Sequence, residues 1–202
     1  MSRRWGFIGL LGALVTSGLS VAVGQSSNVS ATGTFEYQVL ATTRTSTMER
    51  ELNEAAEQGY RFQAVMGGDT SFGGSEVVAL VMRGGDATSG RYVYRLLATG
   101  QTSTMQEELK EAGGEGFEYR GQTVFESFFG GEEVVVILER DDDAPALQYD
   151  YLLLATTRTS TLEEELSEAG QHSYEFMGLT VAETAFGGEE VVVITRRVRP
   201  AK

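Results

Sequence analysis

The chain repeats one pattern of apolar and polar positions three times, at a spacing of 57 residues. The best-marked part reads LATTRTSTMERELNEAAEQGY at residues 40–60, and it returns at residues 97–117 and 154–174. The register then holds without a gap as far as FGGSEVV, FGGEEVV and FGGEEVV. A fixed period of this kind is typical of tandem copies of one supersecondary unit. The chain is therefore predicted to contain three copies of one small fold.

The middle of each copy predicts an amphipathic helix. Apolar residues recur at i, i+4 and i+7, a spacing that lines one helix face, and charged residues fill most of the positions between them. The apolar stripe consists of Met48, Leu52 and Ala55, then of Met105, Leu109 and Ala112, and finally of Leu162, Leu166 and Ala169.

Both ends of each predicted helix carry a signal. In every copy a serine stands three residues before a glutamate or glutamine, which is the spacing of a capping box. We therefore expect the N-caps to be Ser46, Ser103 and Ser160. The left-handed residue that commonly ends a helix is expected at Gly59, Gly116 and Ser173.

Three strands are predicted around each helix. A first strand precedes it, because apolar and polar residues alternate from Phe35 to Ala41. A second strand follows with alternating aromatic residues, as in Tyr60 and Phe62. After a Gly-Gly turn comes a third strand, at residues 76–82, 133–138 and 190–195. Each copy is thus predicted to be a βαββ unit, and the chain to belong to the α+β class.

The third strand indicates how the sheets are built. It is apolar at consecutive positions, as in Val134 to Leu138, and such a run suits a central strand covered on both faces. A right-handed crossover makes the first two strands parallel and leaves room for the third between them. We expect mainly antiparallel sheets of order 1-3-2 with one helix on a face. Because a unit of about 50 residues buries little surface, the three sheets should pack together, around a pseudo-threefold axis or as a continuous sheet.

The N-terminal residues have the features of an export signal. Arg3 and Arg4 precede an uncharged, largely apolar run, and small residues favour cleavage after Gly24 or after Ala22. The alternative is an uncleaved membrane anchor, since the run is nearly long enough to span a bilayer. The expected organisation is a signal peptide at 1–24, a flexible lead at 25–34, and repeats at 35–83, 92–140 and 149–197.

The charge balance excludes two classes of partner. The chain has 16 Lys and Arg against 29 Asp and Glu, and loss of residues 1–24 removes two arginines and no acid, leaving a net charge of −15. Nucleic acids and anionic membranes both require clustered basic residues. The chain has no cysteine, so an exported form must be stable without disulfides.

The sequence contains no recognisable catalytic constellation. Cysteine is absent and the single histidine, His172, falls at an exposed helix end, which leaves no zinc site or histidine-activated nucleophile. No nucleophile elbow, phosphate-binding loop or dinucleotide fingerprint is present. No catalytic residue, cofactor or metal is therefore predicted.

Several polar residues keep their type in all three copies. They are Thr42, Thr45, Thr47, Glu51, Glu54, Glu76 and Arg83, with their counterparts 57 and 114 residues later. Helix formation and strand closure account for many of them. The Phe-Gly-Gly element at Phe72, Phe129 and Phe186 most simply anchors a hairpin turn. The remaining candidates for ligand binding are Thr45, Glu51, Thr102, Glu108, Thr159 and Glu165.

Each copy resembles a bacterial family, the small βαββ domain of unknown function 4177. The resemblance rests on short motifs: Tyr92-Val93-Tyr94, Glu108-Leu109, Gly116-Phe117-Glu118-Tyr119 and the closing Arg140. Tyrosine or phenylalanine stands where that family often has tryptophan after the glycine. The resemblance implies the fold and no activity.

These observations favour a secreted or periplasmic, non-enzymatic repeat protein that acts as a structural or binding module. The alternative is a small-ligand carrier or hydrolase-like enzyme that uses threonines and glutamates at clefts between repeats. Expected partners are another exported protein or a small ligand, with sheet edges offering a route to oligomers. The ligand, the partner and the oligomeric state stay open.

Overall fold

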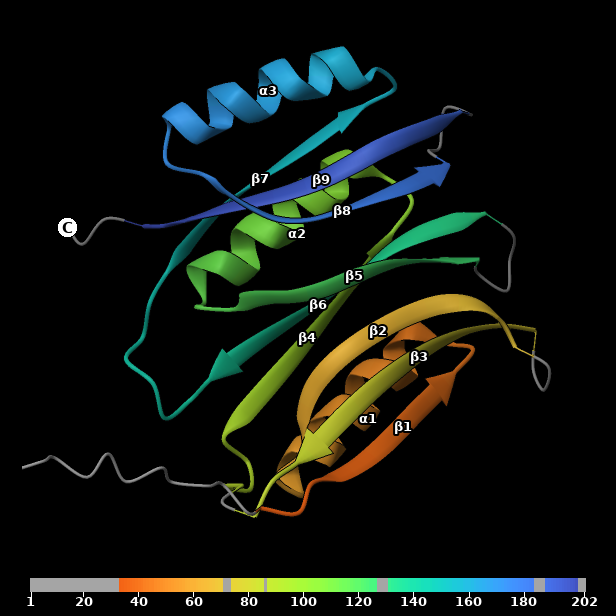
Figure 1. Ribbon diagram of the computed structural model, residues 1–202, viewed down its shortest axis with the longest axis vertical. Coiled ribbons are helices and arrows are strands. Elements are labelled where there is room, and N and C mark those ends of the chain that lie inside the picture. The colour runs from red at the N-terminus through yellow and green to blue at the C-terminus, as the bar shows by residue number, and fades with distance from the viewer. Residues whose placement is uncertain (1–32, 71–73, 86, 127–130, 184–187, 200–202) are drawn as a thin grey trace, which may run out of the picture. The chain divides into compact units, whose positions relative to one another are not determined.

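The computed structural model describes residues 33–70, 74–85, 87–126, 131–183 and 188–199, which form three βαββ repeats (Figure 1). The predicted signal peptide and the phenylalanines of the Phe-Gly-Gly elements lie outside these ranges. Within them, no helix is long and apolar enough to cross a membrane. The elements are β1 Glu36–Thr42, α1 Thr45–Glu57, β2 Arg61–Thr70 and β3 Gly74–Arg83; β4 Tyr92–Thr99, α2 Thr102–Gly114, β5 Glu118–Glu126 and β6 Glu132–Asp141; and β7 Tyr149–Thr156, α3 Thr159–Gln171, β8 Glu175–Glu183 and β9 Glu189–Val198.

The predicted sheet topology is confirmed. The strand orders are β1-β3-β2, β4-β6-β5 and β7-β9-β8, and every neighbouring pair is antiparallel. The register is the same in each repeat, so that Tyr37 lies opposite Met82 as Tyr94 lies opposite Glu139. The second strand also shifts register at the same place each time, between Phe62 and Ala64 in the first repeat. The repeats therefore have the same strand register and the same irregularity, and not only the same order of elements.

The predicted serine N-caps are wrong. The helices have Arg44, Gln101 and Arg158 as N-caps, none with a side-chain cap hydrogen bond. Ser46 is the second helical residue, too far along to accept at the cap position. The turn into the helix is held two residues before the N-cap instead, where the Thr42 hydroxyl accepts a hydrogen bond from the Arg44 N–H at 3.2 Å. The same contact is made by Thr99 and Thr156, which accounts for a threonine in every copy.

The predicted helix ends are confirmed. Gly59 and Gly116 have φ of +85° and +87°, and Ser173 adopts the same left-handed conformation at +64°. In the first repeat the Tyr60 N–H donates to the Ala55 carbonyl and the Gly59 N–H to that of Ala56, which is the pattern of a Schellman motif. The third repeat keeps this motif with a serine, which bears a steric cost that glycine avoids.

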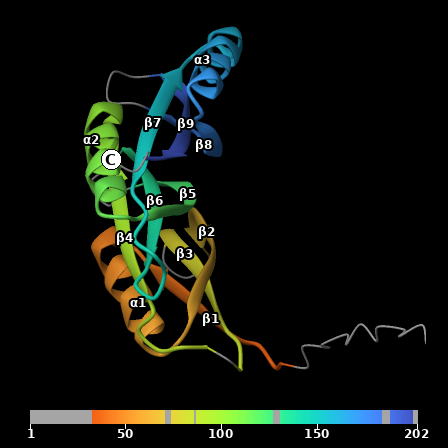
Figure 2. The ribbon, with the colours of Figure 1, turned by 90° about the vertical axis from the view of Figure 1, so that its left-hand side faces the viewer.

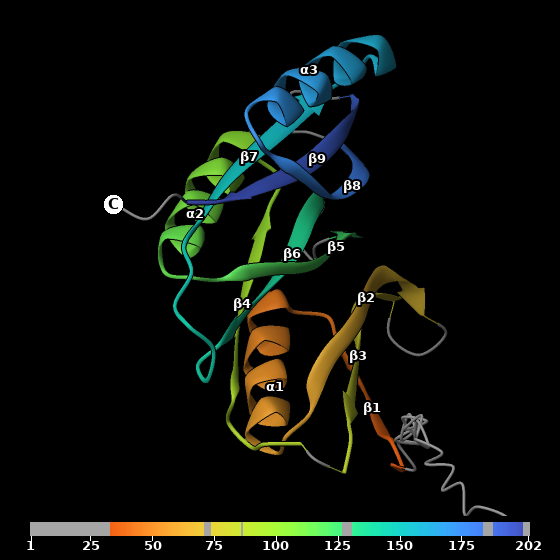
Figure 3. The same ribbon diagram turned by 60° about the vertical axis from the view of Figure 1, so that its left-hand side comes forward.

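Sheets and helices alternate in a stack, because α1 and α2 each pack on their own sheet and also on the sheet of the next repeat (Figure 3). One core cluster joins Met48 and Leu52 of α1 to Tyr94 and Ile137 of the second repeat. A second cluster joins α2 and β6 to the third repeat in the same way. All residues from Val134 to Leu138 are buried as a result, which confirms that this central strand is covered on both faces.

The arrangement of repeats is neither of the two that the sequence left open. The three sheets are separate rather than continuous. Figures 1 and 2 show the second repeat between the other two, with β2 beside β5 and β5 beside β8. The helix contacts run in one direction only, from α1 to β4 and from α2 to β7. Within the described ranges the stack is therefore open, with the sheet of repeat 1 at one end and α3 at the other.

The strained serine at the end of α3 generates a stability prediction. Ser173→Gly should raise the free energy of unfolding by about 0.5–1 kcal/mol, because glycine adopts a positive φ without the Cβ penalty. Chemical denaturation measures the change. Gly59→Ser, which places the same serine at the equivalent position of α1, should lower stability by at least as much, because its Cβ would also lie only 3.3 Å from the Ala87 Cβ. Equal stability of Ser173→Gly and the wild type would contradict the left-handed conformation at this residue.

Candidate functional site

Several buried polar contacts lie at the two junctions between repeats, and each junction contains a buried tyrosine. The Tyr94 hydroxyl accepts a hydrogen bond from the Phe62 N–H of the first repeat at 2.8 Å and donates to Glu139 at 2.8 Å. Tyr151 repeats the arrangement, accepting from the Tyr119 N–H at 2.7 Å and donating to the Phe117 carbonyl at 2.9 Å. Each tyrosine thus ties the first strand of one repeat to the second strand of the repeat before it.

Helix side chains satisfy the open edge of the next sheet. Asn53 of α1 donates to the Tyr94 carbonyl and accepts from its N–H, at 3.0 and 2.9 Å, and Glu49 accepts from the Leu96 N–H at 2.8 Å. At the second junction Gln106 of α2 makes both kinds of bond, to the Tyr151 carbonyl and from the Leu153 N–H. Strands β4 and β7 are edge strands, so these bonds pair backbone groups that a sheet edge leaves unpaired. Glu49 and Gln106, expected to complete capping boxes, serve the neighbouring repeat instead.

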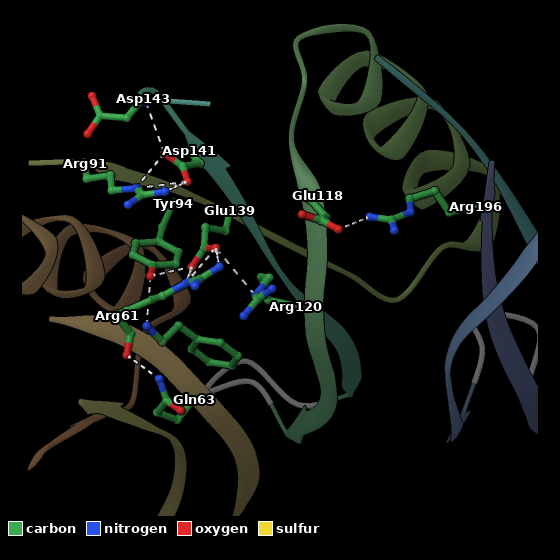
Figure 4. Close-up of polar contacts among 11 residues, drawn as sticks. Arg61, Gln63, Arg91, Tyr94, Glu118, Arg120, Glu139, Asp141, Asp143 and Arg196 are labelled. Carbon is green, nitrogen blue, oxygen red and sulfur yellow. Dashed lines mark hydrogen bonds and ion pairs between the residues drawn. The ribbon is translucent and has the colours of Figure 1, made fainter. Parts of the chain in front are cut away.

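The first junction contains a buried carboxylate. Glu139 is only 3 % exposed, and Arg61 donates to it through two nitrogens, with N–O distances of 2.8 to 3.2 Å (Figure 4). Arg120 approaches the same carboxylate at 3.6 Å. The Arg61 guanidinium also lies over the Tyr92 ring, 4.4 Å from its centre. Two cations and a hydroxyl donor therefore compensate the charge of Glu139 away from bulk water.

The second junction uses the same two positions with the charges exchanged. Glu118, the counterpart of Arg61, accepts from Arg196, the counterpart of Glu139, at 2.7 Å. Arg196 is the more buried partner and lies over the Tyr149 ring, 4.6 Å from its centre. Stacking repeat 1 directly on repeat 3 would place Arg61 against Arg196. The exchange of charges therefore favours the native order of repeats over this alternative.

A polar cleft of about 310 Å³ lies beside these pairs, lined by residues of all three repeats. Most of the charged groups in the cleft are paired with an opposite charge. Arg61 pairs with Glu139, Arg140 with Asp142, and Asp141 with Arg91, the residue just before β4. The hydrogen bonds from Arg91 hold the pKa of Asp141 below its ordinary value. The described ranges contain no cluster of His, Cys, Asp or Glu suited to a metal ion. The arrangement is typical of a structural ion-pair network.

The predicted ligand-binding pairs are not brought together by the fold. Thr102 borders a small recess with Met105, Leu153 and Val192, whereas Glu108 faces an open hollow on the other side of α2. A separation of six residues turns a helical side chain by about 240°, so the two point to different faces. Thr45 with Glu51 and Thr159 with Glu165 stand at the same helical positions.

The glutamates of these pairs retain one feature of interest. Glu108 and Glu165 each have a buried carboxylate oxygen without a hydrogen-bond partner in the described part of the chain. Burial, with a smaller contribution from nearby Glu111, raises the pKa of Glu108. A buried oxygen without a hydrogen-bond partner is costly. A ligand that donated a hydrogen bond to either oxygen would remove that cost and so gain binding free energy.

The arginine that ends the third strand has a structural role, as predicted. Arg83 pairs with Glu36, donates to the Gln58 carbonyl at 3.0 Å and lies over the Tyr60 ring. Arg197 makes equivalent contacts with Asp150, the His172 carbonyl and the Tyr174 ring. The residues that sequence reasoning missed are the junction tyrosines, although a tyrosine at one position of every copy was visible. Their alternation within a strand indicated core packing, and no pattern along the chain revealed a bond to the preceding repeat.

The buried carboxylate at the first junction predicts a large mutational effect. Arg61→Gln should lower the free energy of unfolding by about 3 kcal/mol, since it leaves Glu139 buried with only the more distant Arg120. The matched change Glu118→Gln should cost about 1 kcal/mol, because its amide still accepts from Arg196, which still stacks on Tyr149. Urea denaturation compares the two. A larger cost for Glu118→Gln would show that the first junction does not depend on this pair.

The buried tyrosines predict a loss of stability in alkali. Burial raises the pKa of Tyr119 to about 12 and raises those of Tyr94 and Tyr151 further above the ordinary 10.0. Above pH 10 the unfolded chain loses these protons while the folded chain keeps them. The tyrosines therefore contribute their whole stabilisation below pH 10, and the free energy of unfolding falls as the pH rises above it. Denaturation curves from pH 8 to 11.5 measure the slope. Tyr151→Phe should be less stable at pH 8 and fall less steeply, whereas identical slopes would refute the assignment.

Comparison with known proteins adds no assignment to this geometry. No family model, curated protein or solved structure matches the chain. The function must therefore be inferred from what the repeats bury, what they pair and what they leave exposed.

Proposed function

We propose that this chain is an exported, non-enzymatic interaction module whose three βαββ repeats present contact surfaces at the two ends of the stack. The observation that carries the proposal is the apolar character of both ends. The outer surface of repeat 1, the proximal face, exposes Tyr37, Val39 and Met66, and that of repeat 3, the distal face, exposes Phe176, Leu179 and Val181. Each of these six side chains is at least 50 % exposed.

Apolar end faces are unusual for a repeat array that works alone. Terminal repeats normally carry a polar outer surface, because nothing stacks on them. Clustered exposed apolar residues mark interaction sites on soluble proteins. The three equivalent helices differ in how much they bury: α1 and α2 each bury four residues, whereas α3 buries only Ala169. Repeat 3 thus retains a helix surface of the kind that the other repeats cover with a neighbour.

The use of the polar residues also supports a non-enzymatic role. The threonine before each helix holds a turn, the closing arginine holds a helix end, and the junction tyrosines join repeats. A tandem enzyme needs only one intact active site, so identity in three copies suits a repeated structural contact better. The resemblance to the domain of unknown function 4177 is compatible with this reading and supplies no activity. Export rests on the pattern of residues 1–24.

A small-ligand carrier is the second candidate, and one observation favours it. The unpartnered carboxylate oxygens of Glu108 and Glu165 offer acceptors to a ligand with hydrogen-bond donors. The hollow beside Glu108 also contains Ser103, Lys110 and Arg199, so both charges are available there. This hollow is open and shallow rather than enclosed, however, which suits a ligand less well than a cavity.

Charged substitutions on the end faces test the interaction module. Val39→Asp and Val181→Asp should each abolish recovery of cross-linked partners from the exported fraction of the host, because a buried unpaired carboxylate is costly at an apolar interface. Leu147→Asp is the matched control: Leu147 is also apolar and 49 % exposed, but lies in the linker before β7.

The outcomes separate the two candidate functions. Equal recovery of partners by all three aspartate variants would overturn the interaction module. Loss of a bound small molecule in Glu108→Gln and Glu165→Gln, with unchanged recovery by the face variants, would favour the carrier.

A further inference from the structure

We propose that the distal face of one chain docks on the proximal face of a second copy, so that the stack of repeats continues head to tail between molecules. The inference rests on the proposed function, from which it takes the two faces as contact surfaces, and it names the partner. Its basis is that the two faces are the unused halves of the interface that the chain already forms twice.

The exposed residues of the distal face match residues that lie inside the internal junctions. Phe176 corresponds to Phe62 and Tyr119, and Phe62 is 1 % exposed where it packs against repeat 2. Val181 corresponds to Val124, which packs in the cluster shared with repeat 3. These positions of the second strand face the following repeat in repeats 1 and 2. In repeat 3 they face outward with nothing stacked on them in the described ranges.

The proximal face matches the other side of the same junctions. Tyr37 corresponds to Tyr94 and Tyr151, which are 3 % and 4 % exposed, yet Tyr37 itself is 61 % exposed. Val39 corresponds to the half-buried Leu96 and Leu153. An apolar residue at each position is explained in repeats 2 and 3 by the repeat before them. Docking of a second copy gives repeat 1 the same neighbour.

The polar contacts of the junction can also form between copies. Strand β1 has the register of β4, so Tyr37 and Val39 present the same backbone groups to the open edge as Tyr94 and Leu96. The Tyr37 hydroxyl would accept from the Phe176 N–H. Because the donor is a backbone group, this contact does not depend on which side chain stands at position 176. Glu163 of α3 is exposed and would accept from the Val39 N–H, as Glu49 accepts from Leu96.

Two tight contacts between repeats are compatible with this docking. A Cβ at Gly67 would lie 1.9 Å from the Val124 carbonyl oxygen, but only the first repeat has glycine there: the second junction has Val124 at this position, as the docking interface has Val181. In the second strand, Gly121 and Gly178 lie against the rings of Phe62 and Tyr119, and the first repeat has Ala64 at this position. A Cβ at Gly178 would lie 2.1 Å from the Tyr119 hydroxyl, but one at Gly121 would lie 3.4 Å from the Phe62 ring, an ordinary contact. The docking ring, Phe176, lacks a hydroxyl. Ala64 therefore fits against it.

The ion pair of the internal junctions is missing between copies. Glu175 stands where Arg61 and Glu118 stand, and Met82 where Glu139 and Arg196 stand. The pair is neither attractive nor repulsive, and two acidic chains repel each other at long range. The association should therefore be weaker than the internal junctions and should strengthen with salt, which screens the repulsion. An asymmetric contact of this kind extends into open chains of molecules when it does not close into a ring.

Mixing of singly blocked variants tests the head-to-tail geometry. The exported chain should show concentration-dependent self-association in sedimentation velocity, which Val39→Asp and Val181→Asp each weaken more than tenfold and Leu147→Asp leaves unchanged. A mixture of the two blocked variants, one of them fluorescently labelled, should form a 1:1 dimer and nothing larger. It contains one intact distal face and one intact proximal face, and dimer formation also demonstrates that both variants are folded.

A substitution that should strengthen self-association provides an independent test. Met82→Arg supplies the missing partner for Glu175 and should tighten self-association about threefold, the range of a partly exposed ion pair. Glu175→Gln in the same chain should cancel that gain.

The proposal is overturned if the wild type stays monomeric at all concentrations and salt levels, or if either blocked variant still forms homodimers. Self-association that appears only after removal of residues 25–34 would also overturn it, because that segment would then be the natural cover of the proximal face. If the face variants lose a different exported protein while the chain stays monomeric, the interaction module stands and the second copy does not.

Discussion

A βαββ repeat covers only one face of its three-stranded sheet with its own helix, and the rest of this structure depends on how the second face is covered. The central strand of each sheet is apolar at consecutive positions, so both of its faces must be removed from water. For the second and third sheets the chain achieves this by placing the helix of the preceding repeat between two sheets. Met48 and Leu52 belong at once to their own repeat and to a core that contains Ile137 of the next. The repeats are therefore parts of one folding unit.

The junctions add polar contacts that give this stacking its direction and order. A helix can shield a sheet edge only if its side chains reach the free backbone groups, which Asn53, Glu49 and Gln106 do. The ion pairs Arg61–Glu139 and Glu118–Arg196 place opposite charges at equivalent positions with the signs exchanged. Buried pairs of this kind contribute little net stability but penalise incorrect partners strongly. We infer that divergence of the copies served to fix which repeat stacks on which.

The same construction explains the surfaces at the two ends. Duplication copies both sides of an interface into every repeat, but an open stack of three uses each side only twice. The first repeat keeps the tyrosine that elsewhere binds a preceding strand, and the third keeps the apolar strand face that elsewhere meets a following sheet. Within the part of the chain that the structure describes, these end faces are apolar surfaces on which no further repeat is stacked.

The amino-acid sequence by itself determined the repeat, the βαββ order, the strand order and the left-handed residues at Gly59, Gly116 and Ser173. These follow from local periodicity, conformational preference and the handedness of crossovers, all of which are properties of a single copy. The tertiary structure alone decided what lies between copies. A serine three residues before Glu49 predicts a capping box. The Glu49 carboxylate instead accepts from the Leu96 N–H, because the neighbouring edge strand offers that N–H unpaired. The bond from Phe62 to Tyr94 likewise depends on which helix and strand faces meet, and that choice is made by packing among residues far apart in the chain. The separation of Thr102 from Glu108 is different, because it follows from the local geometry of one helix.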